Sequence, residues 1–130
     1  MIKNPQIRKP IAIASGAVLG SLARYTIGQY LLQSFNAFFP LEILIINVTG
    51  CFLMGFISTI VSRKFSTNPE LFLFLTTGFL GGYTTFSAYE FDIVAQLEHL
   101  EVGGIVYWIG TPILALLSLE IGIRLSELWE

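Results

Sequence analysis

Residues 76–89 read Thr-Thr-Gly-Phe-Leu-Gly-Gly-Tyr-Thr-Thr-Phe-Ser-Ala-Tyr and lie in the middle of the longest predicted helix. Positions 78–85 alone hold three glycines and two threonines. Glycine costs a helix about 1 kcal/mol relative to alanine, and a helix broken at mid-membrane must be buried or line a wet cavity. The composition therefore favours a break whose exposed carbonyls could bind a cation. The alternative is that the glycines let another helix approach closely, and both can hold.

The composition predicts an integral membrane protein. Of 130 residues, 54% are hydrophobic and only 12% are charged, about half the ~25% typical of soluble domains. The mean hydropathy is +0.72. No basic cluster is large enough to bind nucleic acid. Cys51 and His99 are the only residues of their types, so they cannot form a structural zinc site.

Charged residues mark the ends of four apolar segments. Residues 43–62, 71–89 and 102–119 contain no charge, and residues 11–41 contain only Arg24. A membrane-spanning helix needs about 20 mostly apolar residues. We therefore expect an all-α membrane protein with one domain over residues 1–130. Its four helices are predicted at about 11–33, 41–61, 70–96 and 103–123, the third broken at mid-membrane.

The lysines and arginines are distributed unevenly across the predicted membrane. With four spans, both termini and the loop between the second and third spans share one side. That side carries Lys3, Arg8, Lys9, Arg63, Lys64 and Arg124, and the loops on the other side carry no lysine or arginine. Because positively charged loops stay inside, the bias predicts that both termini are cytoplasmic.

Two polar residues stand inside the first two segments. Asn47 could donate N–H groups to an anion or to water, or could hydrogen-bond a neighbouring helix. Arg24 follows Gly16-x-x-x-Gly20, a spacing that permits close helix contact. Its guanidinium could raise the anion concentration at a pore mouth, or extend to the interface.

The last two segments contain aromatic and hydroxyl pairs at helical spacing. Phe86 and Tyr89 share one face, where their positive ring edges could line an anion path. Packing is the commoner use of such pairs. Tyr107 and Thr111 are also on one face, and Pro112 could free a helix carbonyl. No nucleophile–base pair or phosphate loop is present, so we do not expect an enzyme.

Taken together, three blocks of the sequence resemble the CrcB/Fluc family of fluoride channels. The first-helix block is Gly16-x-x-x-Gly20-x-x-x-Arg24-Tyr25, and the second-helix block is Asn47-x-x-Gly50-x-Phe52-x-x-Gly55. The third-helix block, residues 78–87, is highly specific and reads Gly-Phe-Leu-Gly-Gly-Tyr-Thr-Thr-Phe-Ser. The resemblance covers nearly the whole chain.

The resemblance implies two pores made by an antiparallel pair of subunits around a structural sodium ion. By motif position, the carbonyls of Gly81 and Thr84 would hold the sodium. The anion path would be lined by Asn47, Phe86, Tyr89, Ser87, Tyr107 and Thr111, with Arg24 in the vestibule.

The chain departs from the family pattern just after the third block. Ala88 stands where the family has a threonine, and Tyr89 where it has a phenylalanine. Glu90 replaces a usual serine, and Asp92 a usual glutamate. These changes bear on the efficiency of one pore more than on the fold.

The resemblance implies a passive fluoride exporter, which we expect in the inner membrane of a bacterium. The alternative is a small multidrug-resistance-type proton-coupled antiporter, which needs a carboxylate inside the membrane. Residues 11–61 contain only one acid, Glu42, and it lies at a helix end. The partner is either a second copy or a paralogue with the opposite charge bias, and the six-to-none distribution of lysine and arginine favours the paralogue.

Overall fold

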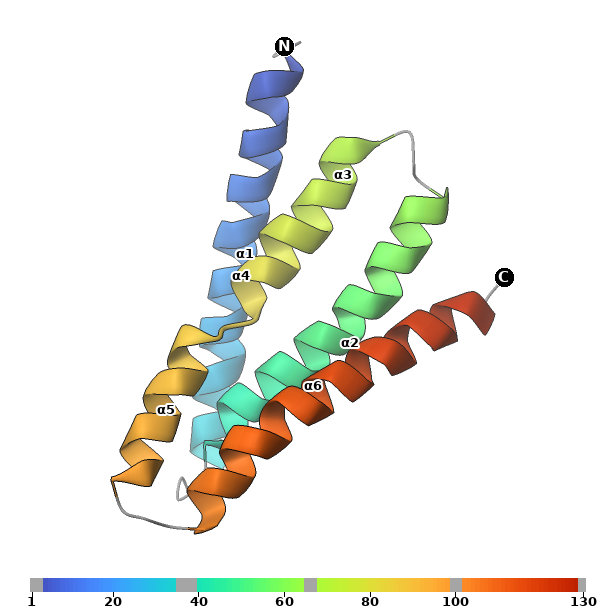
Figure 1. Ribbon diagram of the computed structural model, residues 1–130. Coiled ribbons are helices and arrows are strands. Elements are labelled where there is room, and N and C mark those ends of the chain that lie inside the picture. The colour runs from blue at the N-terminus through green and yellow to red at the C-terminus, as the bar shows by residue number, and fades with distance from the viewer. Residues whose placement is uncertain (1–3, 35–39, 65–67, 99–101, 129–130) are drawn as a thin grey trace.

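The computed structural model describes residues 4–34, 40–64, 68–98 and 102–128, all built from helices and their ends. Figure 1 shows their arrangement. The elements, in chain order, are α1 (Pro5–Ser34), α2 (Leu41–Lys64), α3 (Pro69–Leu73), the π-helical segment η1 (Phe74–Leu80), α4 (Gly81–Tyr83), α5 (Ser87–Leu97) and α6 (Val102–Leu128).

Four stretches of the described chain are long and apolar enough to cross a membrane. They are Pro5–Ser34, Leu41–Arg63, Pro69–Ala95 and Val102–Leu128. The prediction of an all-helical, multi-pass membrane protein is therefore confirmed. Large apolar side chains remain exposed along α1 and α6 in the single subunit, as expected of surfaces that face lipid or another subunit.

The first and last helices of the chain, α1 and α6, are longer than the apolar pattern predicted. α1 begins at Pro5 and α6 ends at Leu128, whereas hydropathy suggested about 11 and 123. Apolar composition limits the part that fits the hydrocarbon, but helical hydrogen bonds continue into the polar flanks. At the start of α1, Asn4 Oδ1 accepts the Gln6 N–H at 3.0 Å, and Pro5 follows as the first helical residue.

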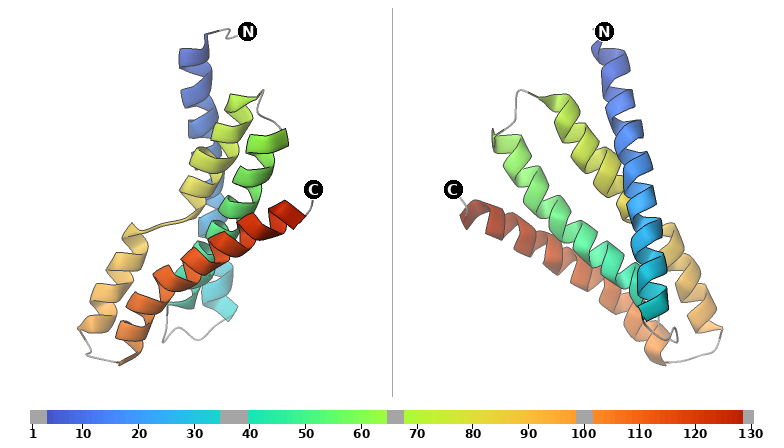
Figure 2. Two further views of the ribbon diagram at one scale, coloured as in Figure 1. Left: turned by 45° about the vertical axis from the view of Figure 1, so that its right-hand side comes forward. Right: turned by 180° about the vertical axis from the view of Figure 1, so that it is seen from behind.

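The third span changes backbone conformation along its length. Asn68 caps its start by accepting the Leu71 N–H at 3.1 Å. η1 then leads into the short α4, which ends at Tyr83. Thr84 is extended, with φ −76° and ψ 157°, and α5 begins at Ser87. The left view of Figure 2 shows the extended ribbon that joins α4 to α5.

Glycines allow α2 and α6 to pack along each other, side by side in Figures 1 and 2. A Cβ atom at Gly55 would lie 2.2 Å from the Leu119 carbonyl oxygen. A Cβ at Gly122 would lie 2.2 Å from the Phe52 carbonyl oxygen. Backbones at this separation leave no room for a side chain.

The contact between α1 and the third span depends on glycine in the same way. A Cβ at Gly20 would lie 2.0 Å from the Phe79 carbonyl oxygen, and one at Gly16 would lie 2.3 Å from that of Phe74. On the third span, a Cβ at Gly82 would lie 2.7 Å from the Ala17 carbonyl oxygen of α1. The close-packing interpretation of the glycine spacing in residues 16–20 is thus confirmed.

Ion pairs join the helix ends at one end of the bundle. Arg8 of α1 contacts Glu70 of α3 at 3.3 Å, and Arg63 of α2 contacts Glu127 of α6 at 3.3 Å. Exposed pairs of this kind contribute little stability. The first pair joins the start of α1 to the start of α3, and the second joins the end of α2 to the end of α6.

The glycine interface predicts different effects for two substitutions in α6. Gly122→Leu should lower the midpoint of thermal unfolding in detergent. The new side chain would collide with the backbone of α2, and overpacking of this kind costs about 1–3 kcal/mol. Gly110→Leu is the matched control, since a Cβ at Gly110 meets nothing within 4 Å. Unfolding followed by circular dichroism measures both, and equal midpoints would contradict the packing argument.

Candidate functional site

Asn47 of α2 binds the backbone of Thr85 at two points. Its Nδ2 donates to the Thr85 carbonyl at 2.9 Å, and its Oδ1 accepts the Thr85 N–H at 2.8 Å. Asn47 is buried, and Thr85 lies between α4 and α5. Of the two roles considered for this amide, the structure shows the interhelical one. Only one N–H of the Asn47 amide is used in this pair, so the second can serve another acceptor.

This pairing changes which carbonyls of the third span have donors. The Thr84 N–H donates to the Leu80 carbonyl at 3.0 Å, as in a continuing helix. The next donor, the Thr85 N–H, would reach the Gly81 carbonyl in a regular helix, but here it binds Asn47 instead. The Gly81 carbonyl therefore loses its helical partner.

Arg24 of α1 contacts the same region from the other side. Its guanidinium Nη1 donates to the Thr84 carbonyl at 3.2 Å, and its side chain is partly buried. The cation therefore lies against the extended backbone between α4 and α5. It satisfies a carbonyl that the non-helical backbone leaves without a helical donor.

A groove of about 520 Å³ lies beside this segment. It brings together six of the predicted site residues from α2, the third span and α6. Its lining is Asn47, Cys51, Gly81, Thr84, Thr85, Phe86, Tyr89, Thr111, Pro112, Ala115, Leu116 and Leu119.

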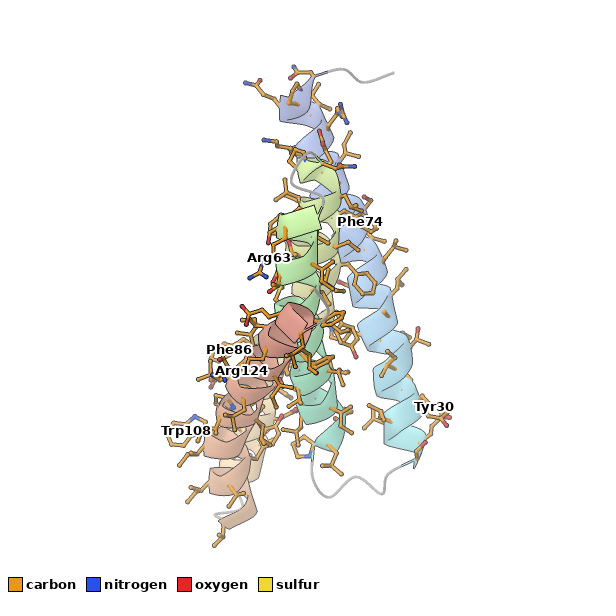
Figure 3. All side chains as sticks on the ribbon, turned by 90° about the vertical axis from the view of Figure 1, so that its right-hand side faces the viewer. Tyr30, Arg63, Phe74, Phe86, Trp108 and Arg124 are labelled. Atoms are coloured by element: carbon orange, nitrogen blue, oxygen red, sulfur yellow. The ribbon has the colours of Figure 1, made fainter. Side chains whose placement is uncertain are left out.

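Aromatic rings run from the surface of this groove inward. Phe86 is 71% exposed, whereas Tyr89 is 3% exposed. Their ring centroids are 5.7 Å apart and tilted by 47°, and Tyr89 lies 5.4 Å from the ring of Tyr107. The Tyr89 hydroxyl donates to the Trp108 carbonyl of α6. In Figure 3, Phe86 and Trp108 lie on the same side of the molecule, away from Tyr30.

Thr111 contributes a hydroxyl to the groove. The residue is 3% exposed, and its Oγ1 has no hydrogen-bond partner among the described residues. A buried hydroxyl without a partner is costly in an apolar environment, and a small acceptor in the groove could satisfy it.

Three predicted residues lie elsewhere. Ser87 and Arg24 line a second depression of about 350 Å³. Tyr107 is buried and does not line the groove, but its ring contacts that of Tyr89, which does. The predicted set therefore divides between the main groove, a flank beside α1 that holds Ser87 and Arg24, and Tyr107, which lies behind Tyr89.

Some polar contacts were not predicted from the sequence. The Thr49 and Tyr83 hydroxyls lie 3.1 Å apart, and the Ser118 hydroxyl donates to the Val48 carbonyl at 2.9 Å. The Thr85 backbone was also missed as the partner of Asn47. The sequence shows an amide inside the second span and a run of glycine and threonine inside the third, but it does not give the register that pairs them.

The comparison with known proteins decides the family. The family described as CrcB-like protein, Camphor Resistance (CrcB) matches residues 11–123. This chain belongs to the CrcB-like family. The matched range includes every predicted site residue, from Arg24 to Thr111.

Relatives within the CrcB-like family are similar over almost the whole chain. A protein of Synechococcus sp. (strain JA-2-3B'a(2-13)) is 41% identical over 98% of both chains. A protein of Trichormus variabilis is 42% identical over 98% of this chain and 95% of its own. One from Rhizobium meliloti is 40% identical over 90% and 94%. Each is named "Fluoride-specific ion channel FluC".

The pairing of Asn47 with Thr85 predicts local protection of the third span. Asn47→Ala removes both hydrogen bonds, and a buried N–H left without a partner costs about 1–3 kcal/mol. We expect faster amide hydrogen exchange in peptides that cover residues 80–90, measured by mass spectrometry in detergent. Cys51→Ala, one turn along α2 in the same groove, should leave that exchange unchanged. Unaltered exchange in Asn47→Ala would contradict the role of the amide.

Proposed function

We propose that this chain is a fluoride-selective channel that lets cytoplasmic fluoride leave the cell passively. The proposal rests above all on the relatives of about 40% identity over nearly the whole chain, which are named fluoride-specific ion channels. Because these relatives are channels, the protein is not expected to catalyse a reaction. The membrane-spanning helices of the structure agree with this function.

The groove has the chemistry that fluoride needs. Fluoride is small and accepts strong hydrogen bonds, so a path must replace part of its hydration without holding it too tightly to leave. The second N–H of Asn47 and the Thr111 hydroxyl are donors in the groove, and the exposed Phe86 offers a ring edge. None of these groups carries a full positive charge.

The second subunit completes the path in this proposal. The groove opens on the surface of a single subunit, and Phe86 at its edge is largely exposed. A partner in the antiparallel orientation would cover this edge and create a second path. The partner is a second copy of the chain or a paralogue with the opposite charge bias.

A structural sodium ion between the subunits is also part of the proposal. The backbone fits: the Gly81 carbonyl has lost its helical donor, and both Gly81 and Thr84 line the groove. No cluster of three His, Cys, Asp or Glu side chains occurs among the described residues, so backbone oxygens are the available ligands. Arg24 holds the Thr84 carbonyl in the single subunit and would have to release it. The bound ion would supply a fixed positive charge beside the anion path.

We also propose that the protein lies in the inner membrane of a bacterium, with both termini in the cytoplasm. The similar proteins named above come from bacteria. The helix ends that carry Arg8 and Arg63 lie at one end of the bundle, and positive residues of short loops stay on the cytoplasmic side.

Fluoride release from liposomes tests the proposed function. Purified protein should release trapped fluoride, followed with a fluoride electrode, once valinomycin lets potassium carry the compensating charge. Asn47→Asp should abolish release, because it puts a carboxylate in the groove and against the Thr85 carbonyl. Leu128→Ala, an exposed change at the end of α6, is the control. Release of chloride at the same rate, or no release of either ion, would contradict the proposal.

The charge bias predicts one dominant topology in the cell. Single cysteines placed at each terminus in a Cys51→Ala background should react with an impermeant maleimide only after the membrane is opened. An antiparallel channel in cells would then require a paralogue of opposite bias, whereas detergent imposes no orientation and permits pairs of this chain. Substantial labelling from outside intact cells, with fluoride efflux from this chain alone, would show that a single gene product forms both orientations.

A further inference from the structure

Pro112 leaves a carbonyl of α6 without its normal donor. It lies inside the helix Val102–Leu128, and proline has no N–H. In a regular helix, residue 112 would donate to the carbonyl four positions earlier, which belongs to Trp108. Inside a membrane such a carbonyl needs another partner, because water is not available to it.

Tyr89 supplies that partner from the neighbouring helix. Its hydroxyl donates to the Trp108 carbonyl, which joins α5 to α6. The Tyr89 ring lies between Phe86 and Tyr107, at centroid distances of 5.7 and 5.4 Å, and only 3% of the residue is exposed. Both the ring and the hydroxyl are therefore held in one orientation.

This orientation determines what Tyr89 presents to the groove. Tyr89 and Pro112 both line it, next to the Thr111 hydroxyl, which has no hydrogen-bond partner in the described part of the chain. A phenol directed into the groove would add a strong donor for a small anion. With its hydroxyl on the Trp108 carbonyl, Tyr89 offers the ring instead.

We propose that Pro112 is a positioning residue of the anion path, which directs the Tyr89 hydroxyl onto the Trp108 carbonyl and away from a passing anion. This inference rests on the proposed channel function. Conduction requires that each site bind the ion weakly enough to release it. With Pro112 in place, a tyrosine can lie beside the groove without its hydroxyl binding fluoride and slowing its passage.

The proposal predicts a specific dependence of flux on two residues. Pro112→Ala restores an N–H that competes with the Tyr89 hydroxyl for the Trp108 carbonyl. A hydroxyl held less firmly can turn into the groove, so fluoride release from liposomes should slow by about tenfold. Adding Tyr89→Phe to Pro112→Ala removes that hydroxyl and should recover most of the lost rate. Pro10→Ala, which removes the proline inside α1, is the matched control and should leave release unchanged.

A purely structural role for Pro112 gives a different result. If only the shape of α6 mattered, the double variant would release fluoride as slowly as Pro112→Ala, because Tyr89→Phe does not restore the shape that Pro112 gives α6. That result, or wild-type release from Pro112→Ala, would overturn the proposal.

Thermal unfolding keeps the test independent of the channel function. Tyr89→Phe should lower the unfolding midpoint when Pro112 is present, because it strips the Trp108 carbonyl of its donor. In the Pro112→Ala background the same change should have little effect. Equal decreases of the unfolding midpoint in both backgrounds would refute the claim that the Tyr89 hydroxyl replaces the missing N–H of residue 112. Absence of fluoride release from the wild type would refute only the channel assignment.

Discussion

The hydrogen-bonded pair of Asn47 and the Thr85 backbone is the constraint on which the rest of the site depends. One amide binds both polar atoms of one peptide residue, at 2.9 and 2.8 Å. By taking the Thr85 N–H, it prevents the helical bond to Gly81, so α4 stops at Tyr83 and α5 starts again at Ser87. Phe86 is exposed and the Gly81 carbonyl is released because the Thr85 N–H donates to Asn47 rather than to Gly81. Backbone that is not helical can exist at membrane depth only with such replacement partners.

Close helix packing brings the remaining partners within reach. Gly16 and Gly20 let α1 touch the backbone of η1 and α4, which places Arg24 one turn further on at the Thr84 carbonyl. Gly55 and Gly122 do the same for α2 and α6. Helices in lipid gain no hydrophobic free energy by associating, so small residues and polar contacts must hold them.

The sequence predicted the architecture better than the details of the site. Uncharged apolar runs predicted four spans, because the hydrocarbon thickness imposes that length on any membrane helix. The blocks around Asn47 and residues 78–87 indicated the family and most residues of the groove. Two features were beyond reach. The partner of Asn47 depends on the register between α2 and the third span, and the Tyr89 hydroxyl finds the Trp108 carbonyl only when α5 and α6 are packed. Ser87 and Arg24 face the flank for the same reason.

The central claim is that the groove beside Asn47 belongs to a passive, fluoride-selective pore. The most direct measurement is the reversal potential of the purified wild-type protein in a planar bilayer, with separate gradients of fluoride, chloride and pH. A passive fluoride pore predicts a potential that follows the fluoride gradient and is insensitive to the other two. A potential that follows chloride, or one that shifts with the pH gradient as in a proton-coupled antiporter, would contradict the account.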